Sequence, residues 1–260
     1  MVGEGSLQEK AQQLFQEGIF LGGPVRDFAR LGRHCLDVLE HEGMRPSSRV
    51  LDVGCGALRV GYWLMQEQGL DTGNYYGIEP NRAMLEVGLT HIVGLETAER
   101  AQPHFDYNDR FDFSVFGEQF DFVLARSVWT HAPKHQISTM LESFSETAAP
   151  GGVFLASYNP VSLLSSLPHT ERAIRQWPKL PLAELSPVLT KLPVLARTRE
   201  YQGREWDGIS HQSDKGSQAG GVRHSLPWIA KEARRHRLKA QLAPYSVLNK
   251  QHWLRISRAD

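Results

Sequence analysis

Two glycines and an acid follow the first apolar strand pattern of this chain, and their spacing favours a nucleotide site. The segment RVLDVGCGALRVG, residues 49–61, places Asp52, Gly54 and Gly56 at the end of a short apolar run. Glycine has no Cβ, so the backbone can turn sharply there and approach a ligand closely. We expect a helix from about residue 57, whose free N–H groups would face the same turn.

A second acid lies where the next strand should end. The apolar run from Tyr75 to Ile78 leads into Glu79 and Pro80. A carboxylate at the tip of a neighbouring parallel strand is well placed to accept hydrogen bonds from ribose hydroxyls. The alternative, a surface acid before a proline, fits less well because an apolar strand precedes Glu79 and a helix pattern follows it. We therefore predict a nucleoside cofactor between the glycine turn and Glu79.

The elements that must position these residues alternate along the chain. We predict strands over 49–53, 74–79, 103–106, 119–126 and 153–158, with helices over 57–68, 81–92 and 134–148. Such alternation is typical of a parallel sheet covered by helices on both faces. A helix near 226–236 and closely spaced strands over 238–244 and 251–257 predict an antiparallel C-terminal hairpin at the sheet edge. The predicted fold is α/β, with a seven-stranded, mostly parallel sheet.

Two segments lie outside this alternation. Helix patterns over 6–18 and 24–42 suggest that residues 1–45 form an N-terminal helical cap, which leaves 46–260 as a Rossmann-like domain. Residues 159–224 are rich in Pro, Ser, Gly and His and show no long period. A loop of this length is usually functional or disordered. We interpret it as a lid over the substrate, inserted after the fifth strand.

Composition narrows the class of protein. The 260 residues are 41% hydrophobic, and 29 basic residues balance 29 acidic ones. Zero net charge argues against an obligatory nucleic-acid partner. The chain has no apolar run long enough for a membrane span and no signal-peptide pattern at its N-terminus. Its two cysteines, Cys35 and Cys55, do not suggest a disulfide framework, and its histidines lack metal-ligand spacing. We expect a cytoplasmic protein without a metal, and the oligomeric state stays open.

At this point the chain resembles the class I S-adenosylmethionine-dependent methyltransferases. The resemblance spans about residues 49–158 and rests on LDVGCG, YYGIEP, NDRFDF at 108–113, FDFVLARSVWTHAP at 120–133 and PGGVFLASY at 150–158. It implies S-adenosylmethionine as cofactor. The chain departs from the family at the third glycine of the turn, where it has Leu58. That departure puts the detail of the methionine pocket in doubt, and it disfavours a dinucleotide, whose pyrophosphate needs a closer backbone approach.

The resemblance also implies roles for individual residues. The methionine end of the cofactor would be lined by Asp52, Gly54 and Gly56, with Cys55 as the small residue of the same turn. Glu79, next to Pro80, would hold the ribose, and Asp109, with the backbone of Arg110 and Phe111, would meet the adenine. Arg126 and Ser127 would lie beneath the sulfonium. Asp52 could instead brace the strand end, and nearby acids leave the register at Asp109 open.

His131 is the candidate catalytic residue. It follows the fourth strand in SVWTHAP, close to the expected point of methyl transfer. A neutral imidazole there could take the proton from an attacking hydroxyl. The alternative is a loop histidine that bonds the backbone before Pro133. Candidate acceptor contacts are Trp129, which could equally be a core residue, and Tyr158, Asn159, Trp206 and His211.

These residues together predict methyl transfer from S-adenosylmethionine to a small-molecule or saccharide acceptor. His131 and the polar lid favour O-methylation over N-methylation, and the saccharide acceptor is an analogy with similar bacterial methyltransferases. One alternative is a protein that binds the cofactor without catalysing transfer. A less favoured alternative is an NAD(P)-dependent oxidoreductase, against which Leu58 and the order of the motifs both count.

Overall fold

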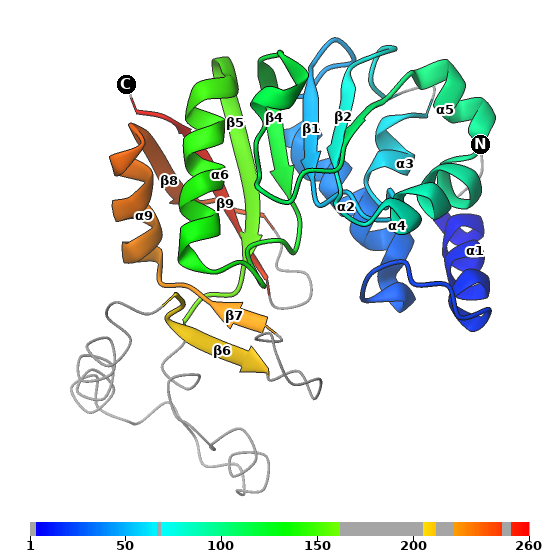
Figure 1. Ribbon diagram of the computed structural model, residues 1–260, viewed down its shortest axis with the longest axis horizontal. Helices are drawn as coiled ribbons and strands as arrows, with labels where there is room; N and C mark the ends of the chain where they lie inside the picture. Colours follow the sequence, from blue (N-terminus) through cyan, green and yellow to red (C-terminus); the bar gives the residue numbers. More distant parts are fainter. Residues whose placement is uncertain (1–3, 67–68, 162–204, 212–220, 246–250, 260) are drawn as a thin grey trace, which may run out of the picture.

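The computed structural model describes residues 4–66, 69–161, 205–211, 221–245 and 251–259. Its main feature is a seven-stranded sheet of order β3-β2-β1-β4-β5-β9-β8 (Figure 1). The strands are β1 (Val50–Val53), β2 (Tyr75–Ile78), β3 (His104–Asp106), β4 (Phe120–Ala125), β5 (Ala148–Tyr158), β8 (Leu238–Leu242) and β9 (His252–Arg258). The first five are parallel, and β9 is antiparallel to both β5 and β8. The predicted α/β fold with its C-terminal hairpin is confirmed.

Helices cover both faces of the sheet (Figure 1). One layer contains α6 (Lys134–Thr147) and α9 (Leu226–Arg235). The other contains α1 (Glu4–Gln16), α2 (Phe28–His41), α3 (Gly61–Leu64), α4 (Arg82–Val87) and α5 (Leu95–Ala101), with the short 3₁₀ helix η1 (Val25–Asp27) and the π-helix η2 (Gly88–Val93). A further turn, η3 (Ser114–Phe116), precedes β4.

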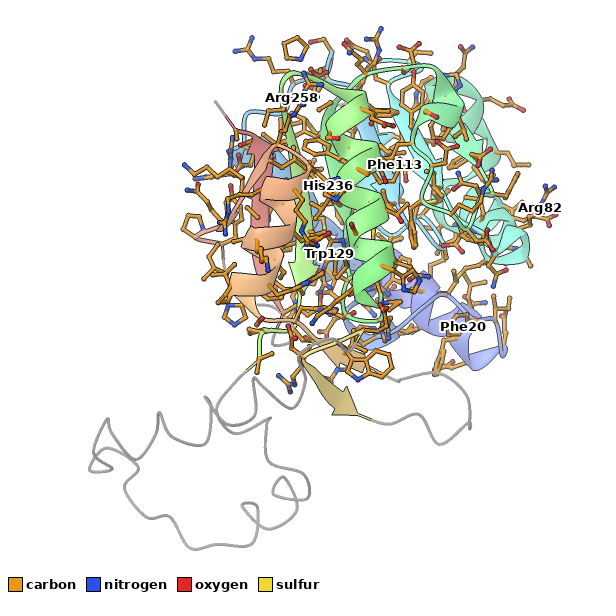
Figure 2. All side chains as sticks on the ribbon, turned by 60° about the vertical axis from the view of Figure 1, so that its left-hand side comes forward. Phe20, Arg82, Phe113, Trp129, His236 and Arg258 are labelled. Carbon is orange, nitrogen blue, oxygen red and sulfur yellow. The ribbon has the colours of Figure 1, made fainter. Side chains whose placement is uncertain are left out.

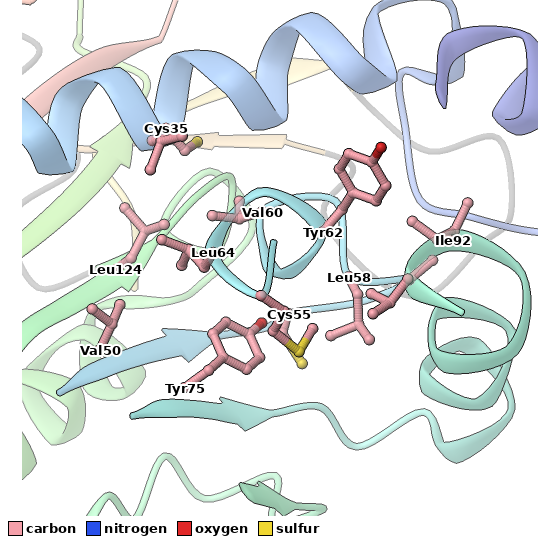
Figure 3. Packing of buried hydrophobic residues seen from close by; sticks show 14 of the residues in the cluster. Cys35, Val50, Cys55, Leu58, Val60, Tyr62, Leu64, Tyr75, Ile92 and Leu124 are labelled. Atoms are coloured by element: carbon pink, nitrogen blue, oxygen red, sulfur yellow. The ribbon is translucent and has the colours of Figure 1, made fainter. Parts of the chain in front are cut away.

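The strands separate two hydrophobic cores. In β1, Val50 packs with the α2 and α3 layer, whereas Leu51 and Val53 pack with the α6 and α9 layer. Successive side chains of a strand point to opposite faces, so a strand buried on both faces is apolar throughout. Figure 3 shows the first core, where Cys35 of α2 and Tyr75 of β2 lie near the glycine turn.

Two local predictions were wrong, and one helix was not expected. The helix expected over 57–68 contracts to α3, because Leu58 has a left-handed φ of 58° that a helix cannot contain. The strand expected over 153–158 begins earlier, at Ala148, so Pro150-Gly151-Gly152 lies inside β5, where the pairing with β4 shifts register. The sequence also gave no sign of α5, a short helix that follows Gly94.

The described part of the 159–224 segment forms a small hairpin, β6 (Gly208–His211) and β7 (Gly221–Arg223), beyond the carboxyl ends of β4 and β5 (Figure 1). Lys134 Nζ lies 2.6 Å from Asp207 Oδ1, and the other oxygen of Asp207 accepts a 2.7 Å hydrogen bond from the Ser225 N–H. The Val222 N–H donates to the Thr130 carbonyl at 2.7 Å. The hairpin is thus tied to the loop after β4, while residues 162–204 and 212–220 of the predicted lid lie outside the described residues.

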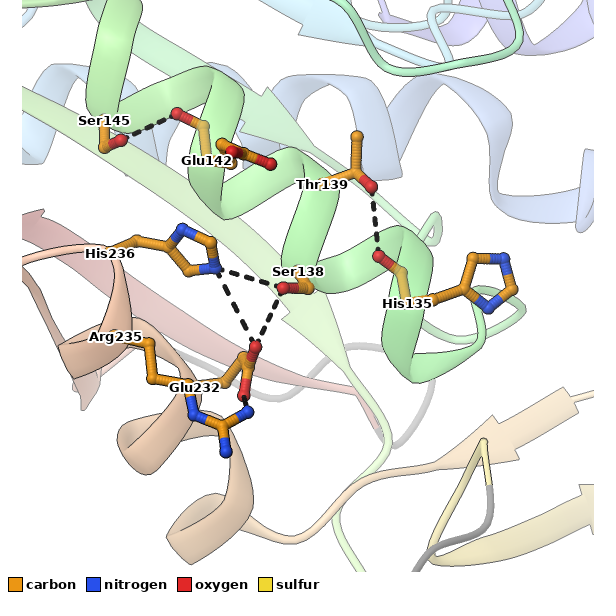
Figure 4. Close-up of polar contacts among 8 residues, drawn as sticks. All are labelled: His135, Ser138, Thr139, Glu142, Ser145, Glu232, Arg235 and His236. Atoms are coloured by element: carbon orange, nitrogen blue, oxygen red, sulfur yellow. Dashed lines mark hydrogen bonds and ion pairs between the residues drawn. The ribbon is translucent and has the colours of Figure 1, made fainter.

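A polar cluster joins the two helices on one face of the sheet (Figure 4). The buried Glu232 of α9 accepts hydrogen bonds of 2.8 Å from Ser138 of α6 and from Arg235. His236 Nε2 also lies 3.0 Å from the Ser138 hydroxyl. Because a buried carboxylate is stable only when it is paired, these contacts fix where α9 crosses α6.

Close packing at Gly32 holds α2 on the segment that carries the glycine turn. A Cβ at Gly32 would lie 2.3 Å from the Arg59 carbonyl oxygen and 2.7 Å from Trp63 Nε1. Gly32→Ala is expected to lower the free energy of unfolding by about 1–3 kcal/mol, the usual cost of overpacking. Urea unfolding measures it, with Gly5→Ala in α1 as control because nothing lies within 4 Å of that position. An unchanged urea midpoint for Gly32→Ala would contradict this packing.

Candidate active site

The glycine turn and Glu79 meet at the carboxyl ends of β1 and β2. The N–H groups of Gly54 and Cys55 donate to the Ile78 carbonyl at 2.8 and 3.2 Å. One Glu79 oxygen accepts a 3.0 Å hydrogen bond from the Gly56 N–H, and the other accepts one of 2.8 Å from the Asn81 N–H. The structure therefore brings together the two features from which the sequence predicted a nucleoside site, with the carboxylate directly against the turn.

The backbone around this edge adopts conformations that favour glycine. Gly54 and Gly56 have φ values of 68° and 55°. A Cβ on Gly54 would lie 2.9 Å from Val128 Cγ2, so only glycine fits under the loop after β4. Leu58, Phe111 and Ser127 are non-glycine residues with positive φ, and each follows the carboxyl end of a strand. Backbone strain of this kind concentrates at ligand sites.

Asp52 lies beneath the turn. Its buried carboxylate accepts a 3.0 Å hydrogen bond from the Tyr75 hydroxyl. Burial raises the pKa of Asp52 to about 7, with a smaller contribution from the charge of Glu79, while the Tyr75 hydrogen bond opposes the rise. The Asp52 side chain thus links β1 to β2 beneath the turn. The neighbouring Cys55 is buried too, and burial raises the pKa of its thiol, as expected for a packing residue and not for a nucleophile.

The loop after β3 is organised by Asn108, a residue that the sequence analysis missed. Its N–H and side-chain amide donate to Asp106 at 2.8 and 2.6 Å, and its side-chain oxygen accepts from the Asp112 N–H at 3.0 Å. Asp106 and Asp112 are therefore engaged within the loop, while Asp109 and Arg110 are exposed and Phe111 is half-buried. The Asp-Tyr-Asn spacing is a side-chain turn signal that could have shown this.

A second polar cluster lies at the carboxyl ends of β4 and β5. The Ser127 N–H donates to the Ser157 hydroxyl at 2.8 Å. Gln251 joins both, because its carbonyl oxygen accepts from Ser157 at 2.8 Å and its amide donates to the Ser127 hydroxyl at 3.0 Å. Arg126 donates to Ser127 and to Gln251. Arg126 and Ser127 were expected here from the sequence. Ser157, although it lies in the motif at 150–158, and Gln251, which lies outside every motif, were not.

His131 and Trp129 lie on opposite sides of the turn after β4. His131 is exposed, and its N–H and that of Ala132 both donate to the Val128 carbonyl at 3.0 Å. Trp129 is fully buried between the sheet and α6, edge-on to Phe154 with ring centroids 5.7 Å apart (Figure 2). The structure therefore places Trp129 in the core and the His131 side chain at the surface, beside the carboxyl ends of the strands.

The other acceptor candidates follow β5 or belong to the hairpin segment. Tyr158 is buried, and burial raises its pKa to about 12. Asn159 joins the two regions, since its carbonyl accepts from the His224 N–H at 3.1 Å. Trp206 is half-buried just before β6, and His211 is the last residue of β6. Asn159 and Trp206 combine partial exposure with a place beside the loop after β4.

Three further observations concern other kinds of site. Among the described residues, no group of three or more His, Cys, Asp and Glu side chains could hold a metal ion. No helix in the described ranges has the length and apolar character needed to cross a membrane. A groove of about 530 Å³ lies on the N-terminal elements, lined by Gln12, Phe15, Gln16, Phe20, Gly22, Gly23, Pro24, Val25 and Arg26.

Comparison with known structures shows the fold. Magnesium protoporphyrin IX methyltransferase from Synechocystis PCC 6803 with bound SAH has a TM-score of 0.54 at 17% identity, covering 96% of this chain and 93% of that one. Human N-acetylserotonin methyltransferase in complex with SAM has a TM-score of 0.53 at 15% identity, covering 99% and 57%. The DhpI–SAH complex has a TM-score of 0.55 at 12% identity, covering 98% and 95%.

A family model supplies the match in sequence. Residues 51–154 match the model described as a methyltransferase domain, and they run from β1 through the glycine turn, Glu79 and His131 into β5. The matched segment therefore contains the strand ends from which the site is built, in the order that the resemblance required. Residues 51–154 are thus similar in sequence to a methyltransferase domain, and the chain shares its fold with methyltransferases whose structures hold bound SAM or SAH.

Proposed function

We propose that this methyltransferase acts on a hydroxyl oxygen of a small-molecule or saccharide acceptor, with His131 as general base. The observation that carries the proposal is the exposed imidazole of His131 in the turn directly after β4. In an open α/β sheet, ligands bind outside the carboxyl ends of the strands. Because β1, β2 and β4 are parallel, the turn that carries His131 lies at the same carboxyl-terminal edge of the sheet as the glycine turn and Glu79.

We assign the cofactor contacts to residues on this edge. Glu79, beside Pro80, would hold the ribose, and Asp109, Arg110 and Phe111 would meet the adenine. The methionine end would be lined by Asp52, Gly54, Cys55, Gly56 and Ser127. The left-handed glycines and the Glu79 carboxylate against the turn support this assignment. When bound, S-adenosylmethionine supplies an activated methyl group for an in-line displacement.

The protein's own contribution would be alignment and proton transfer. Holding the acceptor oxygen in line with the methyl group supplies much of the rate through orientation. As the new bond forms, the hydroxyl proton would pass to a ring nitrogen of His131. The β6–β7 hairpin, tied to the loop after β4 through Asp207 and Val222, would help to exclude water, and we propose the same role for the whole segment over residues 159–224.

Two other observations bear on the acceptor. Two structural neighbours are methyltransferases named for magnesium protoporphyrin IX and for N-acetylserotonin, which are both small molecules. The chain's balanced charge favours no polyanion such as nucleic acid. A cytoplasmic location remains part of the proposal. The alternative of a cofactor-binding protein without activity predicts binding of S-adenosylmethionine but no methyl transfer to any acceptor.

Titration calorimetry of the purified protein tests the cofactor site, with S-adenosylmethionine, S-adenosylhomocysteine and, as control, NADH. We expect micromolar binding of the first two and none of NADH. A screen of hydroxyl and amine acceptors with methyl-labelled cofactor then tests the reaction. Transfer to amines alone would contradict O-methylation, and binding without transfer to any acceptor would favour the non-catalytic alternative.

Glu79→Ala is expected to weaken cofactor binding by about 1–3 kcal/mol, because the ribose hydroxyls would lose their acceptor in a desolvated site. The variant also removes the carboxylate that the Gly56 N–H donates to. Calorimetry with S-adenosylhomocysteine measures the change. Glu86→Ala, at an exposed position of α4, is the matched control and should bind like the wild type. An unchanged dissociation constant in Glu79→Ala would remove the ribose assignment.

A further inference from the structure

Two half-buried arginines follow the paired strands β1 and β4, beside the proposed methionine end of the site. Arg59 follows the glycine turn, and Arg126 is the first residue after β4. Burial and the nearby charge of Arg126 lower the pKa of Arg59 to about 10, and burial also lowers the pKa of Arg126. Both side chains are half-buried, so water screens their repulsion only in part, and an anion between them would relieve it.

The partners of both arginines are neutral. Arg59 donates to the carbonyls of Gly22 and Gly23 at 3.2 Å, and its guanidinium lies 4.7 Å from the centre of the Phe28 ring. Arg126 donates to the side chains of Ser127 and Gln251. Within the described ranges, neither arginine forms an ion pair with a carboxylate. These contacts orient the two groups without neutralising them.

Neither of two nearby side chains supplies the missing charge. Cys35 lies near both arginines, but burial raises the pKa of its thiol to about 12, so the thiol stays neutral. Asp27 is close enough to affect Arg59, yet its carboxylate already pairs with Arg26 at 3.3 Å and with Arg30 at 3.0 Å. A planar guanidinium recognises carboxylate and phosphate through paired N–H donors. The unbalanced charge therefore points to an anionic ligand.

The cofactor alone cannot balance these charges. S-adenosylmethionine carries one carboxylate but also an ammonium and a sulfonium, so it adds net positive charge to the cleft. A guanidinium directly beneath a sulfonium would repel it, which argues against the sulfonium contact that the resemblance suggested for Arg126. An anionic group on the acceptor would lower this repulsion and would hold the acceptor beside the methyl group.

We propose that Arg59 and Arg126 bind an anionic group, a carboxylate or a phosphate, of the acceptor. This inference rests on the proposed function, since it names the class of acceptor for the same site. The acceptor is then a hydroxylated acid, such as a hydroxy acid, an acidic sugar or a sugar phosphate. The arginine pair determines which acceptors bind, while His131 takes the proton.

Anion binding to the cofactor complex tests the proposal. The protein is saturated with S-adenosylhomocysteine and titrated by calorimetry with 4-hydroxybenzoate, galacturonate and inorganic phosphate, and with the neutral counterparts methyl 4-hydroxybenzoate and galactose. We expect saturable binding of at least one anion and at least tenfold weaker binding of its neutral counterpart. Arg59→Gln and Arg126→Gln should each weaken anion binding at least tenfold. Arg126→Lys, which keeps the charge, should recover part of it, and Arg100→Gln, at an exposed site in α5, should change nothing.

The competing source of the anion is the carboxylate of the cofactor itself. If the arginines serve that group, Arg59→Gln and Arg126→Gln will lose affinity for S-adenosylhomocysteine, and the anions will bind only in its absence. That result, or the absence of any anion binding to the wild-type complex, overturns the proposal. Failure of the wild type to bind S-adenosylhomocysteine at all would instead count against the proposed function, so the two failures are distinguishable.

Discussion

His131→Ala should lower kcat by about 10²–10⁴-fold, the usual contribution of a positioned general base. The affinity for S-adenosylmethionine should not change, because the side chain lies after β4 and the ribose and adenine contacts are assigned to the ends of β2 and β3. Steady-state kinetics with a hydroxyl acceptor from the screen, together with calorimetry, measure both quantities. Added imidazole should restore part of the activity, since the variant leaves the base position open to solvent.

The matched control is His91→Ala, at an exposed position in η2 on the other layer of the fold. It should have wild-type kcat and wild-type affinity.

The same experiment tests which acceptor atom receives the methyl group. A hydroxyl needs a base as the methyl group transfers, whereas a neutral amine does not, so a small effect of His131→Ala on an amine substrate would favour N-methylation. Full activity of His131→Ala on a hydroxyl acceptor would remove His131 as the base.

Much of this site could be predicted because its main features are local in sequence. A glycine turn directly after an apolar strand, and an acid at the end of the next strand, leave a pattern in adjacent residues. Parallel pairing then requires that the two strand ends meet, and the Gly56 to Glu79 hydrogen bond of 3.0 Å shows that they do. The antiparallel C-terminal hairpin was predictable for the same reason, since the two strands lie close together in sequence.

The missed features depend on contacts between distant parts of the chain. Gln251 reaches Ser127 and Ser157 from the segment before β9, and no short motif reports such a contact. Arg59 was given no role from the sequence, because its contact with the Gly22 and Gly23 carbonyls depends on how the N-terminal elements fold back. Periodicity also failed at residues 57–68, because it does not report the left-handed backbone at Leu58.

The dependence of stability on pH should consist of two opposing contributions, from Asp52 and His224. Burial raises the pKa of Asp52 from 3.8 to about 7, so the folded state holds a proton that the unfolded state has lost, and stability falls as pH rises through that range. Burial lowers the pKa of His224 from 6.5 to about 4, so stability is lost as pH falls through that range. Each contribution amounts to about 3–4 kcal/mol at about 1.4 kcal/mol per pH unit.

Single variants should separate the two contributions. Asn at position 52 can still accept from the Tyr75 hydroxyl, and Gln at position 224 can still donate to the Ala132 carbonyl, to which His224 Nε2 lies at 2.9 Å. Relative to the double variant, Asp52→Asn should gain stability by about 3 kcal/mol from pH 4 to pH 7, and His224→Gln should lose a similar amount. Urea unfolding at several pH values measures both slopes.

The double variant carries the titration of all the other groups, so it is the baseline for both slopes. Parallel curves for the three variants would contradict the burial of these two groups in the folded state. Opposite slopes would show that the fold holds a carboxyl group with a pKa of about 7 beneath the glycine turn and a neutral imidazole beside the β6–β7 hairpin. A cationic cofactor bound above Asp52 favours its ionised form, so S-adenosylmethionine should flatten the slope of His224→Gln and leave that of Asp52→Asn unchanged.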